Sequence, residues 1–146
     1  MRRREFMSVI AGAAAWPLGA RAEQLAMPVI GFLNPAPAAE AIAHPNIAAF
    51  RRGLAEAGYV EGKNLAIEYR FTNFRPELMT EFAGDLVRLN VSVILAAGPE
   101  ALAAVRNATT SIPIVGLDLE SDPVAKGYVK SLARPGGNVS GMFLDI

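Results

Sequence analysis

Short apolar runs alternate with stretches of helical periodicity along most of this chain. Apolar residues that are continuous or alternate with polar ones predict five strands, over 28–34, 64–71, 91–98, 112–118 and 139–144. Apolar side chains recur at helical spacing over 45–58, 76–89 and 99–109, and each of these segments opens near a proline. A further short helix is predicted over 123–132.

This alternation of strand and helix has the length of βαβ units. The central runs are apolar on both faces, which is typical of parallel strands covered by helices. The run 64–71 instead alternates apolar and polar residues, so we expect it near an edge of the sheet. The predicted class is α/β, with a doubly wound parallel sheet.

The first 22 residues, MRRREFMSVIAGAAAWPLGARA, differ from the rest. Three arginines precede an apolar run over 7–20 and a small-residue site, Ala20-Arg21-Ala22, in the order typical of an export signal. The pair Arg3-Arg4 also fits a twin-arginine signal. A membrane anchor is the alternative, but the run falls short of the roughly 20 residues that span a bilayer. We therefore expect cleavage after Ala22 and a periplasmic product.

Composition narrows the function further. At 146 residues, 52% hydrophobic and 19% charged, the chain has the size of one globular domain. Subtracting the four arginines and one glutamate of 1–22 from 14 basic and 14 acidic residues leaves ten and 13, a net charge of −3. A mildly acidic chain without a basic stripe argues against nucleic acid as a partner. The absence of cysteine excludes disulfides and thiolate metal sites.

Motifs for cofactors and catalysis are missing. No dinucleotide-binding or P-loop motif occurs, so we expect no cofactor and no metal. The segment 137–141 resembles a hydrolase elbow, but its serine comes one place late. His44, the single histidine, precedes Pro45 and is expected to cap a helix or lie in a loop.

In an open parallel sheet, ligands lie beyond the carboxyl ends of the strands, here at 34–38, 97–101 and 118–123. Gly98-Pro99-Glu100 opens a helix, whose free N–H groups suit a ligand with a carboxylate. Asp118, Glu120 and Asp122 could form a metal or phospho-acceptor site, or simply bond within their loop, with Asp122 capping the next helix.

Several segments resemble the substrate-binding proteins of ABC transporters, of the type I periplasmic kind that includes tryptophan and tyrosine import proteins. The most specific are GYVEGKNLAIEYR (58–70) and SLARPGGNVSG (131–141), and the likeness covers nearly all of 23–146. The resemblance implies a flavodoxin-like strand order, 2-1-3-4-5. It also implies a small-molecule ligand, amino-acid-like, and permease subunits in the inner membrane as partners.

Members of that family have two α/β lobes joined by a hinge, with the ligand between them. Residues 23–146 would form the first lobe, because the chain ends at Ile146, where this lobe would cross to the second. The resemblance implies ligand contacts from the loops after the first, third and fourth strands, at Asn34, Pro35, Gly98, Pro99, Glu100, Asp118 and Asp122. The expected function is solute binding without catalysis. A truncated, nonfunctional remnant and an exported α/β enzyme remain as alternatives.

Overall fold

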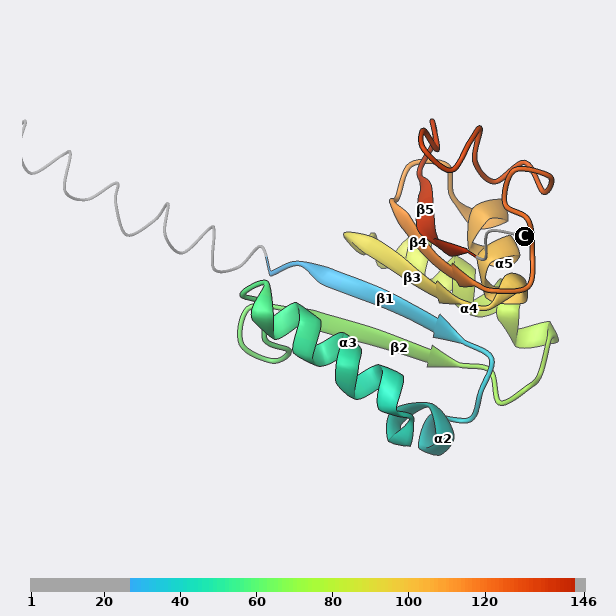
Figure 1. Cartoon of the computed structure of the whole chain (residues 1–146). Coiled ribbons are helices and arrows are strands. Elements are labelled where there is room, and N and C mark those ends of the chain that lie inside the picture. The colour runs from blue at the N-terminus through green and yellow to red at the C-terminus, as the bar shows by residue number, and fades with distance from the viewer. Residues whose placement is uncertain (1–26, 144–146) are drawn as a thin grey trace, which may run out of the picture.

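The computed structural model describes residues 27–143, so the predicted signal over 1–22 lies outside the described part. A five-stranded sheet runs through the molecule in the order β2-β1-β3-β4-β5, with every neighbouring pair parallel (Figure 1). The strands are β1 (Val29–Asn34), β2 (Ala66–Phe71), β3 (Val93–Ala97), β4 (Ile114–Asp118) and β5 (Val139–Phe143). The predicted class, strand order and edge position of the second strand are confirmed.

Helices cover the two faces of the sheet unequally. The helices α4 (Glu77–Arg88) and α5 (Pro99–Ala108) pack on one face, where Leu33, Leu86 and Leu102 belong to the larger apolar core. The helices α2 (Ala38–Ala43) and α3 (Pro45–Glu56) lie on the opposite face (Figure 1). There α3 packs over β1 and β2 through a smaller core around Phe32 and Ile47.

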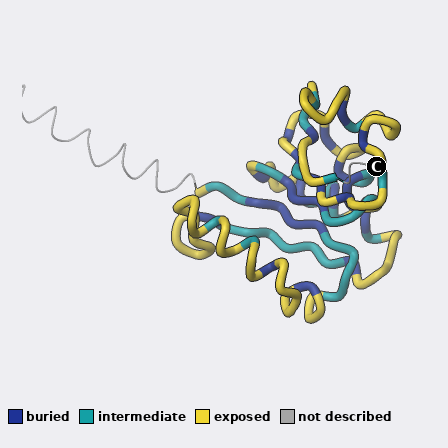
Figure 2. Tube along the Cα trace, viewed as in Figure 1, coloured by how far each residue is buried: buried dark blue, intermediate teal, exposed yellow. Residues whose placement is uncertain are grey.

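The half of that second face formed by β3, β4 and β5 is not covered by a helix within residues 27–143. Leu117 and Met142 on this half are 37% and 62% exposed, whereas most residues of β1 and β3 are buried (Figure 2). No helix in the same part of the chain has the length and apolarity needed to cross a membrane.

The edge strand β5 approaches β4 closely at one point. Gly141 pairs with Gly116, and a Cβ at Gly141 would lie 2.0 Å from the carbonyl oxygen of Gly116. Its φ of +155° also lies in a region that residues with a side chain rarely adopt. Glycine at this position therefore permits the pairing of β5 with β4.

Three details of the sequence prediction are wrong. Residues 123–132 form turns and not a helix, because Gly127 adopts a φ of +71° and interrupts the helical path after one turn. The short helix α2 was not predicted, since its six residues are mostly alanine and carry no apolar period. The predicted helix over 76–89 is α4, which ends at Arg88, so Leu89 is its C-cap and is 54% exposed.

Candidate functional site

The seven predicted ligand residues lie in three loops at the carboxyl ends of neighbouring strands. Asn34 ends β1 and Pro35 follows it, Gly98 to Glu100 join β3 to α5, and Asp118 ends β4 ahead of the loop that contains Asp122. Because β1, β3 and β4 are adjacent and parallel, these loops share one edge of the sheet (Figure 1). We refer to this edge as the carboxyl edge.

Asn34, the last residue of β1, presents a hydrogen-bond donor at the carboxyl edge. Its Oδ1 accepts a hydrogen bond of 2.9 Å from the backbone N–H of Ala36, which fixes the side chain in a tight turn. Its Nδ2 donates to no atom of residues 27–143. An amide held on one side in this way can donate to a ligand on the other.

The start of α5, after the neighbouring strand β3, supplies a second donor. Gly98, at φ +89°, donates its own N–H to the carbonyl of Leu117 at 2.7 Å and so ties the β3 loop to β4. Pro99 has no N–H, and Ala101 is fully buried. The N–H of Glu100, an exposed residue in the first turn, has no acceptor within the helix and none in the described chain.

The two aspartates of the β4 loop hold that loop in shape. Asp118 is fully buried, and its Oδ1 accepts hydrogen bonds of 3.0 Å from the N–H groups of both Glu120 and Ser121. Its Oδ2 is buried and has no partner among the described residues. Asp122 is exposed, and its Oδ1 accepts from the next turn, from Val124 at 2.9 Å and Ala125 at 3.1 Å.

Each aspartate therefore bonds to its own loop, as one of the two sequence interpretations proposed. Asp122 caps a turn, however, because no helix follows it. Within residues 27–143 no group of three His, Asp or Glu side chains is arranged to hold a metal ion. His44 is the N-cap of α3, and its Nδ1 accepts from the N–H of Asn46 at 3.2 Å, which confirms its predicted capping role.

Sequence reasoning missed the loop after β2. Thr72 is fully buried and bonds to the β1 loop twice, through its N–H to the Asn34 carbonyl at 3.1 Å and through Oγ1 to the Pro35 carbonyl at 3.3 Å. Phe74 donates its N–H to the same Pro35 carbonyl at 2.7 Å, and its side chain is 65% exposed. A phenylalanine among polar residues between a strand and Pro76 was the available signal.

A groove opens on the half-covered face of the sheet and reaches the carboxyl edge. It has a volume of about 690 Å³ and lies between α2–α3 and the uncovered strands, with Phe32, Leu95, Val115 and Met142 in its lining. Asn34 lies in its lining too. Its other polar lining residues are Glu40, His44 and Asn46, and the rest of the lining is apolar, so the groove offers mainly apolar burial.

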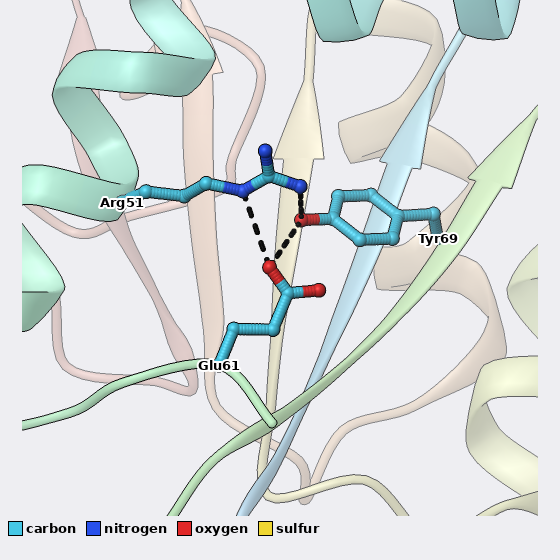
Figure 3. Close-up of polar contacts among 3 residues, drawn as sticks. All are labelled: Arg51, Glu61 and Tyr69. Atoms are coloured by element: carbon cyan, nitrogen blue, oxygen red, sulfur yellow. Dashed lines mark hydrogen bonds and ion pairs between the residues drawn. The ribbon is translucent and has the colours of Figure 1, made fainter. Parts of the chain in front are cut away.

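The main polar cluster outside the carboxyl edge joins α3 to β2 (Figure 3). Arg51 Nη2 donates to the Tyr69 hydroxyl at 2.9 Å, that hydroxyl donates to Glu61 Oε2 at 3.2 Å, and Arg51 Nε lies 3.1 Å from the same oxygen. Burial raises the pKa of Tyr69, and the hydrogen bond to Arg51 opposes this rise. The three side chains bond to one another and join α3 to the edge strand, so we assign the cluster a structural role at the sheet edge.

Comparison with known families gives a match over most of the chain. Residues 39–145 fit the family model for the ABC transporter substrate binding protein. A tyrosine-binding protein of Clostridioides difficile (strain R20291) is 34% identical over 104 residues, which are 68% of this chain and 30% of that protein.

Solved structures show the same arrangement. A conserved domain protein from Vibrio cholerae is 31% identical with a TM-score of 0.66, over 79% of this chain and 38% of that one. A substrate-binding protein with adhesive properties from Clostridium difficile, in a ligand-free, open form, is 29% identical with a TM-score of 0.68, over 82% and 40%. An ABC domain from Streptococcus pneumonia in complex with L-Trp is 24% identical with a TM-score of 0.65, over 80% of this chain and 38% of that one, and it supports the fold. The chain thus spans about a third of the lengths of these relatives.

Proposed function

The chain belongs to the family of ABC transporter substrate-binding proteins, and from this premise we propose that it forms one lobe of the solute-binding component of an importer. Its ligand is a small amino-acid-like solute, bound at the carboxyl edge of the sheet. The permease subunits of the transporter are its partners, and the chain carries out no catalysis.

The observation that carries this proposal is the pair of unfilled donors on neighbouring strand ends. Asn34 Nδ2 and the N–H of Glu100 come from the loops after β1 and β3, which are adjacent strands. Two such donors, one of them at the positive end of a helix, suit a carboxylate.

The charges around these donors favour a ligand that also carries a positive group. The side chains of Glu100, Glu120 and Asp122 are all exposed along the same edge. A free carboxylate ligand would be repelled by them, whereas the ammonium group of an amino acid would be attracted. The similarity to a tyrosine-binding protein supports the same class of ligand.

One lobe supplies only part of a ligand's surroundings. The carboxyl edge is open, and the chain spans 30% of its tyrosine-binding relative and 38–40% of the solved structures named above. Small-molecule sites normally bury 70–90% or more of the ligand. We therefore propose that this chain alone binds its ligand weakly and that a second lobe completes the cleft.

Neither alternative function fits these contacts as well. A catalytic role for the acidic cluster needs Asp118 and Asp122 side by side with a nucleophile, but each side chain accepts hydrogen bonds from its own loop. The interpretation as a nonfunctional remnant predicts no ligand binding, so the titration below separates it from the proposal.

We propose that residues 1–22 direct export to the periplasm and are removed there. N-terminal sequencing of the periplasmic protein is expected to begin at Glu23. Changing Arg3 and Arg4 together to lysine is expected to abolish export if the twin-arginine route is used. Export of an unchanged amount would indicate the ordinary secretory route, and a full-length cytoplasmic product would refute the export proposal.

Asn34→Asp tests the binding proposal with little change in structure. The new side chain keeps the oxygen that accepts from Ala36, but it replaces the free donor with a negatively charged oxygen. Asn107→Asp is the matched control, since Asn107 is exposed in the last turn of α5, at the opposite edge of the sheet. Saturation-transfer NMR with a mixture of amino acids, sugars and carboxylic acids would identify the solutes bound by the unaltered chain.

We expect the unaltered chain to bind an amino acid. Asn34→Asp should lower the affinity for it about tenfold or more, because a hydrogen bond to the ligand carboxylate is replaced by repulsion. Asn107→Asp should have no effect. Equal weakening by both variants, or binding of sugars alone, would contradict the proposal.

A further inference from the structure

The loop after β2 carries an aromatic side chain that the fold does not use. Phe74 is 65% exposed, the largest value for a large hydrophobic side chain within residues 27–143. Its ring makes none of the aromatic contacts that join Phe32, Phe50, Tyr69 and Phe71 in the core nearby. Folding therefore gains little from this ring.

The backbone at Phe74 is also in an unfavourable conformation. Asn73 and Phe74 have φ values of +54° and +56°, in the left-handed region. Asparagine is tolerated there, but a phenylalanine is rare. Strained residues of this kind persist where the surrounding contacts fix them, and they are frequent at ligand sites.

The contacts that fix this loop join it to the proposed site. The N–H groups of Thr72 and Phe74 donate to the carbonyls of Asn34 and Pro35, and the Thr72 hydroxyl donates to the Pro35 carbonyl. The loops after β2 and β1 therefore form one unit, with Phe74 beside the residue that offers the free amide. Phe74 is thus displayed at the carboxyl edge and not in a separate part of the surface.

The order of the loops along the carboxyl edge fits a ligand with a carboxylate at one end and a side chain at the other. The strands follow one another as β2, β1 and β3, so the loop of Phe74 and the loop of the Glu100 N–H flank the loop of Asn34. A ligand whose carboxylate binds Glu100 N–H and Asn34 would direct its side chain toward Phe74.

We infer that Phe74 is a specificity-determining residue, which receives the side chain of the bound amino acid and selects an aromatic ring over an aliphatic chain. This inference rests on the proposed function, since the carboxylate donors set the position of the ligand. Two aromatic rings in offset or edge-to-face contact interact more favourably than their buried area alone provides.

Titration of the ¹⁵N-labelled chain with L-tyrosine and L-leucine, followed by NMR, tests the inference. The two ligands have the same charged groups and differ in the side chain. We expect tighter binding of L-tyrosine. Phe74→Ala should lower the affinity for L-tyrosine about two- to tenfold and leave the affinity for L-leucine nearly unchanged. Phe74→Trp should restore the preference for L-tyrosine. Leu89→Ala, which removes an exposed apolar side chain at the opposite edge, is the control and should change neither affinity.

The outcomes separate this inference from the proposed function. If both ligands bind but Phe74→Ala changes their affinities equally or not at all, the inference is wrong and the proposed function stands. If neither ligand binds, the proposed function is wrong. Titration with 4-methylphenol, a ring without the amino-acid groups, then still tests Phe74. We expect the amide signals of 73–75 to shift, and their absence from the shifted signals would overturn the inference.

Discussion

Phe74→Gly and Phe74→Ala remove the same ring but differ in how they tolerate a left-handed backbone. The φ of Phe74 is +56°, where an alanine is strained by roughly 1–2 kcal/mol and a glycine is not. Glycine also makes the unfolded chain more flexible, which offsets part of this gain. We therefore expect Phe74→Gly to be more stable than Phe74→Ala by about 1 kcal/mol.

Loss of the ring itself cancels in this comparison. About a third of the Phe74 side chain is buried. At roughly 25 cal/mol/Å², removing this buried part costs at most about 1.7 kcal/mol of stability, and the cost is the same for both variants. A difference of about 1 kcal/mol corresponds to roughly 4 °C in Tm or 0.5–1 M in the urea midpoint. Far-UV circular dichroism during urea denaturation would measure it.

Leu89 supplies a control in which the expected sign is reversed. It is also an exposed large hydrophobic residue, but its φ of −71° and ψ of −8° are helical. Leu89→Gly should therefore be less stable than Leu89→Ala by about 0.5–1 kcal/mol. If Phe74→Gly were also the less stable of its pair, the left-handed conformation of Phe74, and with it the argument from strain, would be refuted.

Three further predictions follow from the contacts described above. Gly141→Ala should destabilise the chain by about 3 kcal/mol or more and release β5, because the new Cβ would lie 2.0 Å from the Gly116 carbonyl oxygen. Urea denaturation and hydrogen exchange would measure both effects, and an unchanged urea midpoint would contradict the β4–β5 pairing. Asp118→Asn, which keeps the accepting oxygen, should leave the stability within about 1 kcal/mol. Asp118→Ala should cost about 2 kcal/mol, because two backbone N–H groups lose their acceptor. Equal stability of the two variants would contradict the role of Asp118 in holding its loop. The raised pKa of Tyr69 means that the folded state holds the phenolic proton more tightly than the unfolded state does. The stability gained from this proton is complete below pH 10 and is lost as the pH rises above it. Tyr69→Phe should therefore reduce the fall in urea midpoint between pH 9 and 11, and an unchanged fall would refute the raised pKa of Tyr69.

The sheet could be predicted from the sequence because each buried strand is a short apolar run with its own boundaries. The runs that became β1, β3 and β4 are apolar on both faces, a pattern typical of parallel strands covered by helices, although one face of β3 and β4 has no helix over it in residues 27–143. The alternation in β2 correctly indicated an edge strand. Prediction was wrong over 123–132, where the local pattern was helical but Gly127 ends the turn.

The candidate site could be predicted less completely. The rule that ligands lie beyond the carboxyl ends of parallel strands identified the loops of Asn34 and Gly98 from the sequence. It did not show that Asp118 would be fully buried, because burial depends on how its loop folds back over the sheet. It also gave no weight to Phe74, whose importance comes from a left-handed backbone and from hydrogen bonds to a loop almost 40 residues earlier in the chain.

The central claim is that the carboxyl edge of this sheet binds the ligand, and a map of amide chemical shifts on adding L-tyrosine tests it most directly. We predict that the shifted signals come from 34–36, 72–75, 98–101 and 119–122, which follow the carboxyl ends of four strands. Signals from 58–64 and 89–92, which precede strands at the opposite edge, should stay unchanged. Shifts concentrated at that opposite edge, or along the groove without the carboxyl-edge loops, would contradict the account.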